Sequence, residues 1–306
     1  MYFPYLRGRQ YELLALRELL EKDILSKKIV PIVEPVRFSS ALVKTLGLYG
    51  QKSRGLSIIT NPNVGKFQEE WQNDKNEKLR KDFTQTIAKN NTLLFAKILL
   101  PGVGVEDFIK KYQNRMVTVC YNSDGISVYE NSFSNKDVKY NLILGDEGFK
   151  RKIKKNRVLL ADRFNKLGRN NDYMFADDEL FSEDHLYYPN SEYVGFSDYS
   201  IVGKDYSDSG FAPYAVAIHI VYFAKDNSLR IKHFVSDSND DNSDVAGKFQ
   251  EALEKLVKWN KIMKLNTFGI REFESLYQRE AYPGLGVVKK LSIMHHLELI
   301  STYLDN

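Results

Sequence analysis

Charged and amide side chains follow or interrupt the short apolar runs in the first two thirds of this sequence. They are Arg7, Arg9, Glu34, Asn61, Lys97, Asp146, Asp162, Arg163 and Asp198. Carboxylates and lysines can transfer protons, and guanidinium groups bind phosphate or carboxylate through paired hydrogen bonds. These residue types therefore indicate a polar site for an anionic ligand, provided that the fold brings them together.

We assign these residues to two roles. The candidate catalytic residues are Glu34, Lys97, Asp162 and Asp198, and the candidate ligand-binding residues are Arg7, Arg9, Asn61, Asp146 and Arg163. Lys97 interrupts an apolar run, where a buried ammonium group without an anion would be costly. Lys97 and Glu34 either belong to a functional pocket or form a structural ion pair. The Arg-Gly-Arg segment either holds an anion or binds carboxylates of the protein, and Arg7 and Glu34 could bind each other.

The acidic residues allow a second chemistry. Glu34, Asp146, Asp162 and Asp198 carry the oxygen ligands that Mg²⁺ prefers, and Mg²⁺ assists phosphoester hydrolysis. No particular pair of carboxylates is singled out by the sequence, so Mg²⁺ stays a possible cofactor without an assigned metal site.

The elements that must position these residues alternate between apolar runs and helical or loop segments. The runs lie within residues 2–9, 28–35, 56–60, 93–99, 116–121, 140–144, 157–161 and 193–199. Such alternation is typical of α/β folds with a parallel sheet. It predicts a TIM-barrel-like (β/α)8 barrel, in which the site lies at the carboxyl ends of the strands.

We expect a single barrel domain over residues 1–306 with three additions. Residues 165–192 read as a long polar insertion, residues 214–237 as a β-hairpin and residues 244–306 as C-terminal helices. The sequence leaves open whether residues 193–237 close the barrel or decorate its rim.

The composition and the order of apolar and charged residues indicate where the protein is located. The chain has 306 residues, a net charge of +4, and a single cysteine, Cys120, which fits a reducing cytoplasm and rules out an internal disulfide. The chain starts in an apolar run without the regions of a signal peptide, and no run approaches the roughly 18 apolar residues of a membrane span. A cytoplasmic location is therefore expected. Charge is uneven, with a basic tract at residues 150–169 and an acidic stretch at 172–208.

Two further patterns resemble metal sites. In the predicted hairpin a turn centred on Asp226 and Asn227 pairs His219 with Phe234, which sends His219 and His233 to opposite faces. Of the adjacent histidines 295 and 296, one is expected to pack and the other to be exposed.

Residues 237–243 match the first odd positions of a calcium loop, but position twelve is Lys248 instead of glutamate. We interpret this segment as a loop whose Ser243 or Asp244 caps the following helix.

The opening segments, residues 2–12 and 28–35 with Ala15 and Leu16, resemble the start of the Beta protein family of phages and bacteria. A weaker similarity lies around residues 284–296. The resemblance implies a (β/α) barrel, a role in conflict between bacteria and phages or other mobile elements, and a partner protein encoded nearby.

We therefore expect a component of a bacterial anti-phage or mobile-element defence module that binds a phosphate-bearing ligand, such as a nucleotide or nucleic acid, beside a partner protein. A metal-dependent phosphodiester hydrolase with carboxylates at the barrel mouth is the first alternative. A non-catalytic structural or regulatory subunit is the second, because the fold does not specify a reaction.

Overall fold

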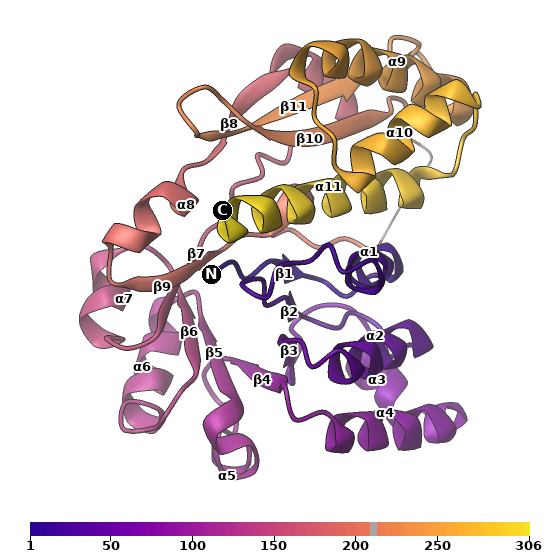
Figure 1. Ribbon diagram of the computed structural model, residues 1–306. Helices are drawn as coiled ribbons and strands as arrows, with labels where there is room; N and C mark the ends of the chain where they lie inside the picture. The colour runs from indigo at the N-terminus through magenta and orange to yellow at the C-terminus, as the bar shows by residue number, and fades with distance from the viewer. Residues whose placement is uncertain (209–212) are drawn as a thin grey trace. The chain divides into compact units, whose positions relative to one another are not determined.

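The computed structural model describes residues 1–208 and 213–306, which group into two compact units. The first unit, here the barrel unit, contains residues 1–13, 27–162 and 184–199. The second contains residues 14–26, 163–183 and 200–306. Each unit has its own sheet (Figure 1). The strand and helix alternation in the sequence does not reveal this division.

Eight parallel strands form the sheet of the barrel unit. They are β1 (Tyr5–Leu6), β2 (Ile32–Val33), β3 (Leu56–Ile59), β4 (Leu93–Ile98), β5 (Met116–Cys120), β6 (Tyr140–Ile143), β7 (Arg157–Leu160) and β9 (Tyr193–Ser197). Each strand pairs with the next in this order. Their apolar sequences fit strands that are covered on both faces. The predicted TIM-barrel-like fold is confirmed.

The last strand closes the barrel against the start of the chain. The main-chain N–H of Phe3 donates to the carbonyl oxygen of Phe196 at 2.8 Å, and Tyr2 and Phe196 form a parallel bridge. Glycine is required at position 195, because an added Cβ would lie 2.5 Å from the carbonyl oxygen of Met1. The segment from 193 to 199 therefore completes the barrel.

Side chains from every strand, or from residues next to it, fill the barrel interior. The cluster consists of Phe3, Tyr5, Val30, Ile32, Ile59, Ala96, Ile98, Val117, Val119, Leu142, Val158, Leu160 and Tyr199. Because side chains alternate between the two faces of a strand, every second residue faces this core. This alternation decides which polar residues reach the carboxyl end of the interior.

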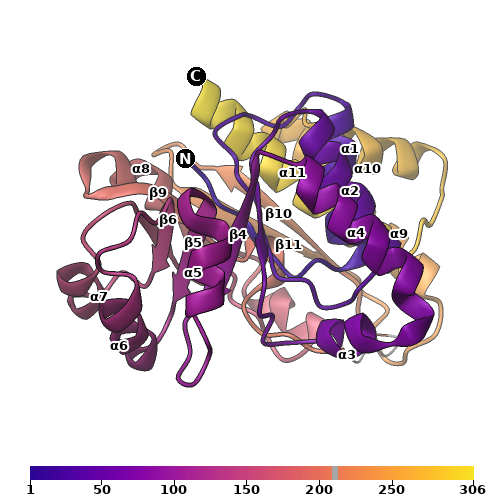
Figure 2. The same cartoon turned by 90° about the horizontal axis from the view of Figure 1, so that it is seen from below.

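Helices form the outer layer of the barrel unit. They are α2 (Ser40–Gln51), α3 (Phe67–Gln72), α4 (Glu77–Lys89), α5 (Glu106–Tyr112), α6 (Ser123–Ser132), α7 (Glu147–Lys152) and α8 (Asp184–Tyr187), with short 3-10 turns at Asp74–Asn76, Gln113–Arg115 and Tyr188–Asn190. Figure 2 shows α2 beside α4, and α5 on the other side of β4. Helix α1 (Gln10–Glu21) is shared between the two units.

The second unit has a three-stranded antiparallel sheet in the order β10-β11-β8. Its elements are β8 (Asp178–Ser182), β10 (Ala217–Phe223), β11 (Leu229–Val235), α9 (Val245–Met263), α10 (Phe268–Gln278) and α11 (Leu285–Asp305), with 3-10 turns at Asn170–Phe175 and Ser200–Val202. The β-hairpin and the three C-terminal helices lie where the sequence predicts them. Strand β8 lies in the segment that the sequence analysis interpreted as a long polar insertion. The strand was not predicted because a polar edge strand lacks the apolar pattern of a buried one.

Among the helices of the described residues, none combines the length and the apolar character that crossing a membrane requires.

Candidate functional site

Arg7 and Glu34 contact each other at the carboxyl end of the barrel interior. Each lies two residues beyond an interior residue of its own strand, Tyr5 and Ile32 respectively. Nη1 of Arg7 donates to Oε2 of Glu34, and the two residues are 8% and 0% exposed. The mutual ion pair that the sequence allowed is thus the arrangement in the structure.

The Glu34 carboxylate has two further donors. The Tyr5 hydroxyl donates to Oε2 at 2.7 Å, and the main-chain N–H of Asn63 donates to Oε1 at 2.7 Å. Burial, and then the negative charge of Glu34, raise the pKa of Tyr5 well above its usual value. Both carboxylate oxygens therefore already accept hydrogen bonds from the protein.

Tyrosines surround this ion pair, and the sequence analysis missed them. The rings of Tyr5 and Tyr199 lie 4.8 Å apart, and the guanidinium carbon of Arg7 lies 5.3 Å and 5.5 Å from their centroids. Burial raises the pKa of Tyr199 and of the half-buried Tyr121. The sequence could have indicated Tyr121, because it follows the interior residue Val119 by two positions and alternate residues of a strand face the same side.

The Arg-Gly-Arg segment is shaped by packing. Gly8 has a φ of 63°, and an added Cβ would lie 3.2 Å from Cα of Pro35 and 3.3 Å from the carbonyl oxygen of Glu34. The glycine therefore allows the first strand to approach the second. Arg9 is half-exposed, and its main-chain N–H donates to Oε2 of Glu12 at 3.3 Å.

Three other predicted residues follow the strands but differ in their contacts. Asn61 exchanges two hydrogen bonds of 2.9 Å with the main chain of Ile98, so its amide extends the pairing of β3 with β4. Asp162 is exposed. Burial raises the pKa of Tyr199, and the charge of Asp162 adds to that rise, whereas Arg7 opposes it. Asp146 is exposed and is the N-cap residue of α7.

Two predicted catalytic residues, Lys97 and Asp198, alternate with the interior residues of their strands and therefore face the outside of the barrel. Lys97 lies between the interior residues Ala96 and Ile98, and its Nζ is 5.6 Å from the ring centroid of Phe108. Burial lowers the pKa of Lys97, although Asp107 and Glu106 oppose that shift. Lys97 is not a partner of Glu34, because the alternation of the strand separates them.

Asp198 precedes the interior residue Tyr199 and is 1% exposed. Its Oδ1 accepts a hydrogen bond of 2.7 Å from the Tyr2 hydroxyl. The structure thus places Asp198 in the outer layer and not beside Glu34. Arg163 belongs to the second unit.

The described residues contain no group of three or more histidine, cysteine or acidic side chains with the arrangement of a metal site. Glu34 is bonded to Arg7 and Tyr5, and Asp198 to Tyr2. The carboxylates on which the hydrolase alternative depends are therefore not brought together.

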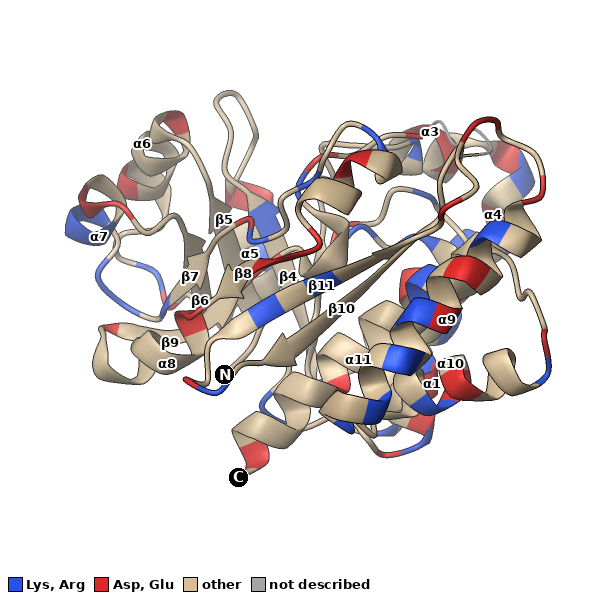
Figure 3. Ribbon diagram, turned by 90° about the horizontal axis from the view of Figure 1, so that it is seen from above, with Lys and Arg blue, Asp and Glu red and all other residues tan. Residues whose placement is uncertain are grey.

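A lysine-lined cavity of about 490 Å³ lies at the opposite end of the barrel, beside the starts of β6 and β7. Its basic residues are Lys136, Lys152, Lys154 and Lys155, three of them from the predicted basic tract. Of the described residues that line it, Asp137 alone is acidic. Figure 3 shows Lys and Arg coloured on α7 and on the loop that follows it.

The four lysines are exposed, and within the part of the chain that the structure describes only Lys152 has a carboxylate partner. Nζ of Lys152 contacts Oε1 of Glu130 at 2.7 Å, whereas Lys136, Lys154 and Lys155 make no ion pair with another described residue. Asn141 and Asn156 hold the cavity walls, because their amides bond the main chain at Lys155 and Val138, both at 2.8 Å. The cavity therefore combines walls held by hydrogen bonds with exposed ammonium groups, which suits an anionic ligand.

In the second unit, the hairpin has a different register from the predicted one. His219 pairs with His233, because the turn has three residues and Asn227 adopts a left-handed φ of 65°. The two imidazoles lie on one face with Nδ1 atoms 2.6 Å apart, and Nε2 of His233 lies 3.3 Å from Oε1 of Glu179. The expected opposite orientation is wrong. Burial lowers the pKa of both histidines, so the neutral pair is favoured.

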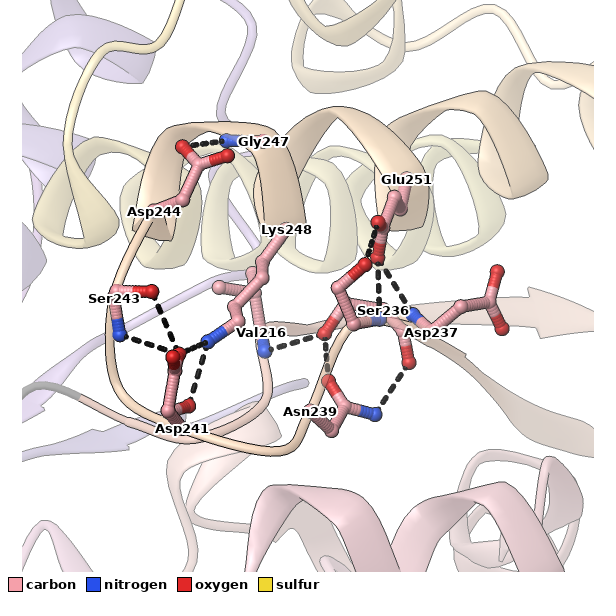
Figure 4. A network of polar contacts seen from close by, with 11 residues as sticks. Val216, Ser236, Asp237, Asn239, Asp241, Ser243, Asp244, Gly247, Lys248 and Glu251 are labelled. Atoms are coloured by element: carbon pink, nitrogen blue, oxygen red, sulfur yellow. Dashed lines mark hydrogen bonds and ion pairs between the residues drawn. The ribbon is translucent and has the colours of Figure 1, made fainter.

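The loop with calcium-site character is occupied by an ammonium group of the chain itself (Figure 4). Nζ of Lys248 lies 2.6 Å from the carbonyl oxygen of Asp241 and 3.3 Å from its Oδ1. Oδ1 of Asp244 accepts the main-chain N–H of Gly247 at 2.9 Å, which confirms the predicted cap of α9.

The adjacent histidines of α11 are both buried, so the expectation that one is exposed is wrong. His295 contacts Thr267 Oγ1 through Nδ1 at 2.7 Å and the carbonyl oxygen of Val221 through Nε2 at 2.6 Å. His296 contacts Ser200 Oγ through Nδ1 at 2.9 Å. Polar partners in the second unit thus allow both rings to be buried.

Comparisons of the chain with protein-family models, with curated proteins and with solved structures found no match.

Proposed function

We propose that this protein binds a phosphate-bearing ligand through the lysine-lined cavity at the amino end of its barrel. The observation that carries the proposal is the gathering of four exposed lysines around one cavity, with a single acidic residue among the described residues of its lining. Ammonium groups bind phosphate as point charges, and a nucleic-acid backbone presents the same chemistry as a small phosphate ester.

The barrel mouth gives this proposal no support, since Arg7 is neutralised by Glu34. Breaking that pair to bind a phosphate would leave a buried carboxylate uncompensated, at a cost of about 3–5 kcal/mol. The anionic ligand that the sequence predicted is therefore assigned to the basic tract and not to the Arg-Gly-Arg segment.

Binding can be tested with a labelled single-stranded oligonucleotide by fluorescence anisotropy, with inorganic pyrophosphate as competitor. We expect the combined change Lys136→Gln, Lys154→Gln and Lys155→Gln to weaken oligonucleotide binding by about a hundredfold, since each lost charged contact is worth roughly 1 kcal/mol or more. The matched control changes three exposed lysines away from the cavity, Lys78, Lys89 and Lys110, to Gln and loses the same net charge.

The outcomes separate the possible ligands. Competition by pyrophosphate at low concentration indicates a small phosphate ester, whereas binding that only the oligonucleotide shows indicates nucleic acid. Equal weakening in the cavity variant and the control would contradict a specific site, as would binding that does not depend on salt.

The biological context that we propose is a cytoplasmic component of an anti-phage or mobile-element defence module that acts beside a partner protein encoded nearby. This part rests on the resemblance of the opening segments to the Beta protein family. Deletion of the gene together with its neighbours should change phage plating. Unchanged plating across a broad phage panel would contradict it.

A non-catalytic role for the barrel itself is the second candidate. The buried and fully bonded Glu34 carboxylate favours it, because a catalytic carboxylate must be accessible to its substrate.

A further inference from the structure

A second cavity of about 680 Å³ lies on the outside of the barrel unit, beside β3 and β4 and between the helices that follow them. Helix α5 has seven residues, whereas α4 has thirteen. The shorter helix covers less of the outer face of β4, which leaves room beside Phe95. The volume is within the range of small-molecule pockets. We call it the aromatic cavity.

One wall of the aromatic cavity is formed by rings from α3 and α4. Trp71 lies 5.3 Å from Phe83 and 6.2 Å from Phe67 between ring centroids. Phe38 packs behind all three rings at 4.9 to 5.6 Å and holds them in place. Helix α3 supplies Phe67 and Trp71 to this wall, and α4 supplies Phe83.

The opposite wall carries two more rings and two cations. Phe95 and Tyr112 are stacked with centroids 3.9 Å apart, and the guanidinium carbon of Arg115 lies 5.1 Å from the Phe95 ring. Lys111 also lines the cavity and is exposed. None of the lining residues in ranges 1–208 and 213–306 is acidic. The cavity thus combines flat apolar faces with positive charge.

We propose that the aromatic cavity binds a flat aromatic ring that carries a phosphate or carboxylate group. The rings of Trp71 and Tyr112 offer stacking faces, and Arg115 and Lys111 neutralise the anion. This site is distinct from the lysine-lined cavity, since the two share no lining residue. The inference therefore stands or falls independently of the proposed function.

The test uses Trp71 as the reporter. The chain has two tryptophans, and Trp259→Phe removes the other. Adenosine 5′-monophosphate and benzoate distinguish a phosphate from a carboxylate source, while adenosine lacks the anion and ribose 5-phosphate lacks the ring. We expect quenching of Trp71 by one of the two aromatic anions, with binding at least about tenfold weaker for the compounds that lack either part.

Two variants locate the binding. Arg115→Gln should weaken it about tenfold, whereas Lys110→Gln, which removes a lysine outside the cavity, should leave it unchanged. Ala88→Phe fills the cavity from α4 without removing any wall and should abolish binding, with circular dichroism as the check on folding. Equal affinity in Ala88→Phe, or no quenching by either aromatic anion, would overturn the proposal. Weakening by the lysine-cavity variant instead would assign the ligand to that cavity.

Discussion

At the carboxyl end of the barrel, Arg7 and Glu34 are buried and bonded to each other, whereas at the amino end Lys136, Lys154 and Lys155 are exposed and make no ion pair with another described residue. Both regions are rich in charge. In the first the charges are neutralised within the protein, and in the second they are free for an external anion. Charge density alone does not identify a binding site, because pairing decides whether the charge is available.

The largest expected effect comes from breaking the buried pair. Glu34→Gln leaves the Arg7 guanidinium buried without its counter-charge and should lower the free energy of unfolding by about 3–5 kcal/mol, measured by urea denaturation. The double variant Arg7→Met, Glu34→Leu should recover much of this loss, because it removes both charges. If Glu34→Gln were as stable as the wild type, the ion pair of Arg7 and Glu34 would not stabilise the fold.

The second unit contains an ionisable group that is buried in its neutral form. His295 is buried, and burial lowers its pKa to about 4. The folded-state pKa lies below the unfolded value of about 6.5, so the unfolded chain binds more protons as the pH falls. We expect about 3 kcal/mol of stability to be lost between pH about 6.5 and about 4, at about 1.4 kcal/mol for each pH unit.

Urea denaturation at several pH values measures this loss, and His295→Gln should flatten the dependence. An unchanged slope in that variant would show that His295 does not cause it, and would shift attention to His219 and His233, whose pKa values are also lowered by burial.

The hydrogen bonds around Glu34 should contribute next. Tyr5→Phe removes the hydroxyl that donates to Glu34 Oε2 at 2.7 Å and should cost about 1.5–3 kcal/mol, the range for a bond to a charged group. The matched control is Tyr199→Phe, which keeps the ring contact with Tyr5. An equal loss in Tyr199→Phe would mean that the loss in Tyr5→Phe is a general effect of removing a buried hydroxyl and does not come from the bond to Glu34.

The smallest stability effect is expected at the lysine-lined cavity. The triple change of Lys136, Lys154 and Lys155 to Gln should alter the free energy of unfolding by no more than about 0.5 kcal/mol for each substitution, because these side chains are exposed. Denaturation curves check this value. A loss comparable to that of Glu34→Gln would erase the contrast between the two regions.

The sequence predicted most of the fold because strand and helix alternation is a local signal. All eight barrel strands, the hairpin and the C-terminal helices lie close to their predicted places. Strand β8 escaped because its residues are mostly polar, and the hairpin register was wrong because Asn227 makes a three-residue turn. Such a turn depends on one backbone angle that composition does not reveal.

The candidate site was harder to predict because it depends on strand phase. The sequence prediction placed Glu34, Lys97 and Asp198 in one site because each lies in or after a strand. Side chains alternate between the two faces of a strand, however, and Lys97 and Asp198 lie on the outer face. Counting by twos from Val119 would have identified Tyr121. The sequence allowed an ion pair of Arg7 and Glu34 but could not decide between it and a ligand site, since the decision depends on how closely the two strands approach each other.

The most direct test of the central claim is the salt dependence of oligonucleotide binding in the wild type and the lysine-cavity variant. For single strands the logarithm of the binding constant falls with the logarithm of salt by about 0.7 for each phosphate contact. If Lys136, Lys154 and Lys155 each contact a phosphate, the slope should decrease by about 2 in the triple variant and remain unchanged in Glu34→Gln. An unchanged slope in the triple variant, at measurable wild-type binding, would contradict the assignment of the ligand to this cavity.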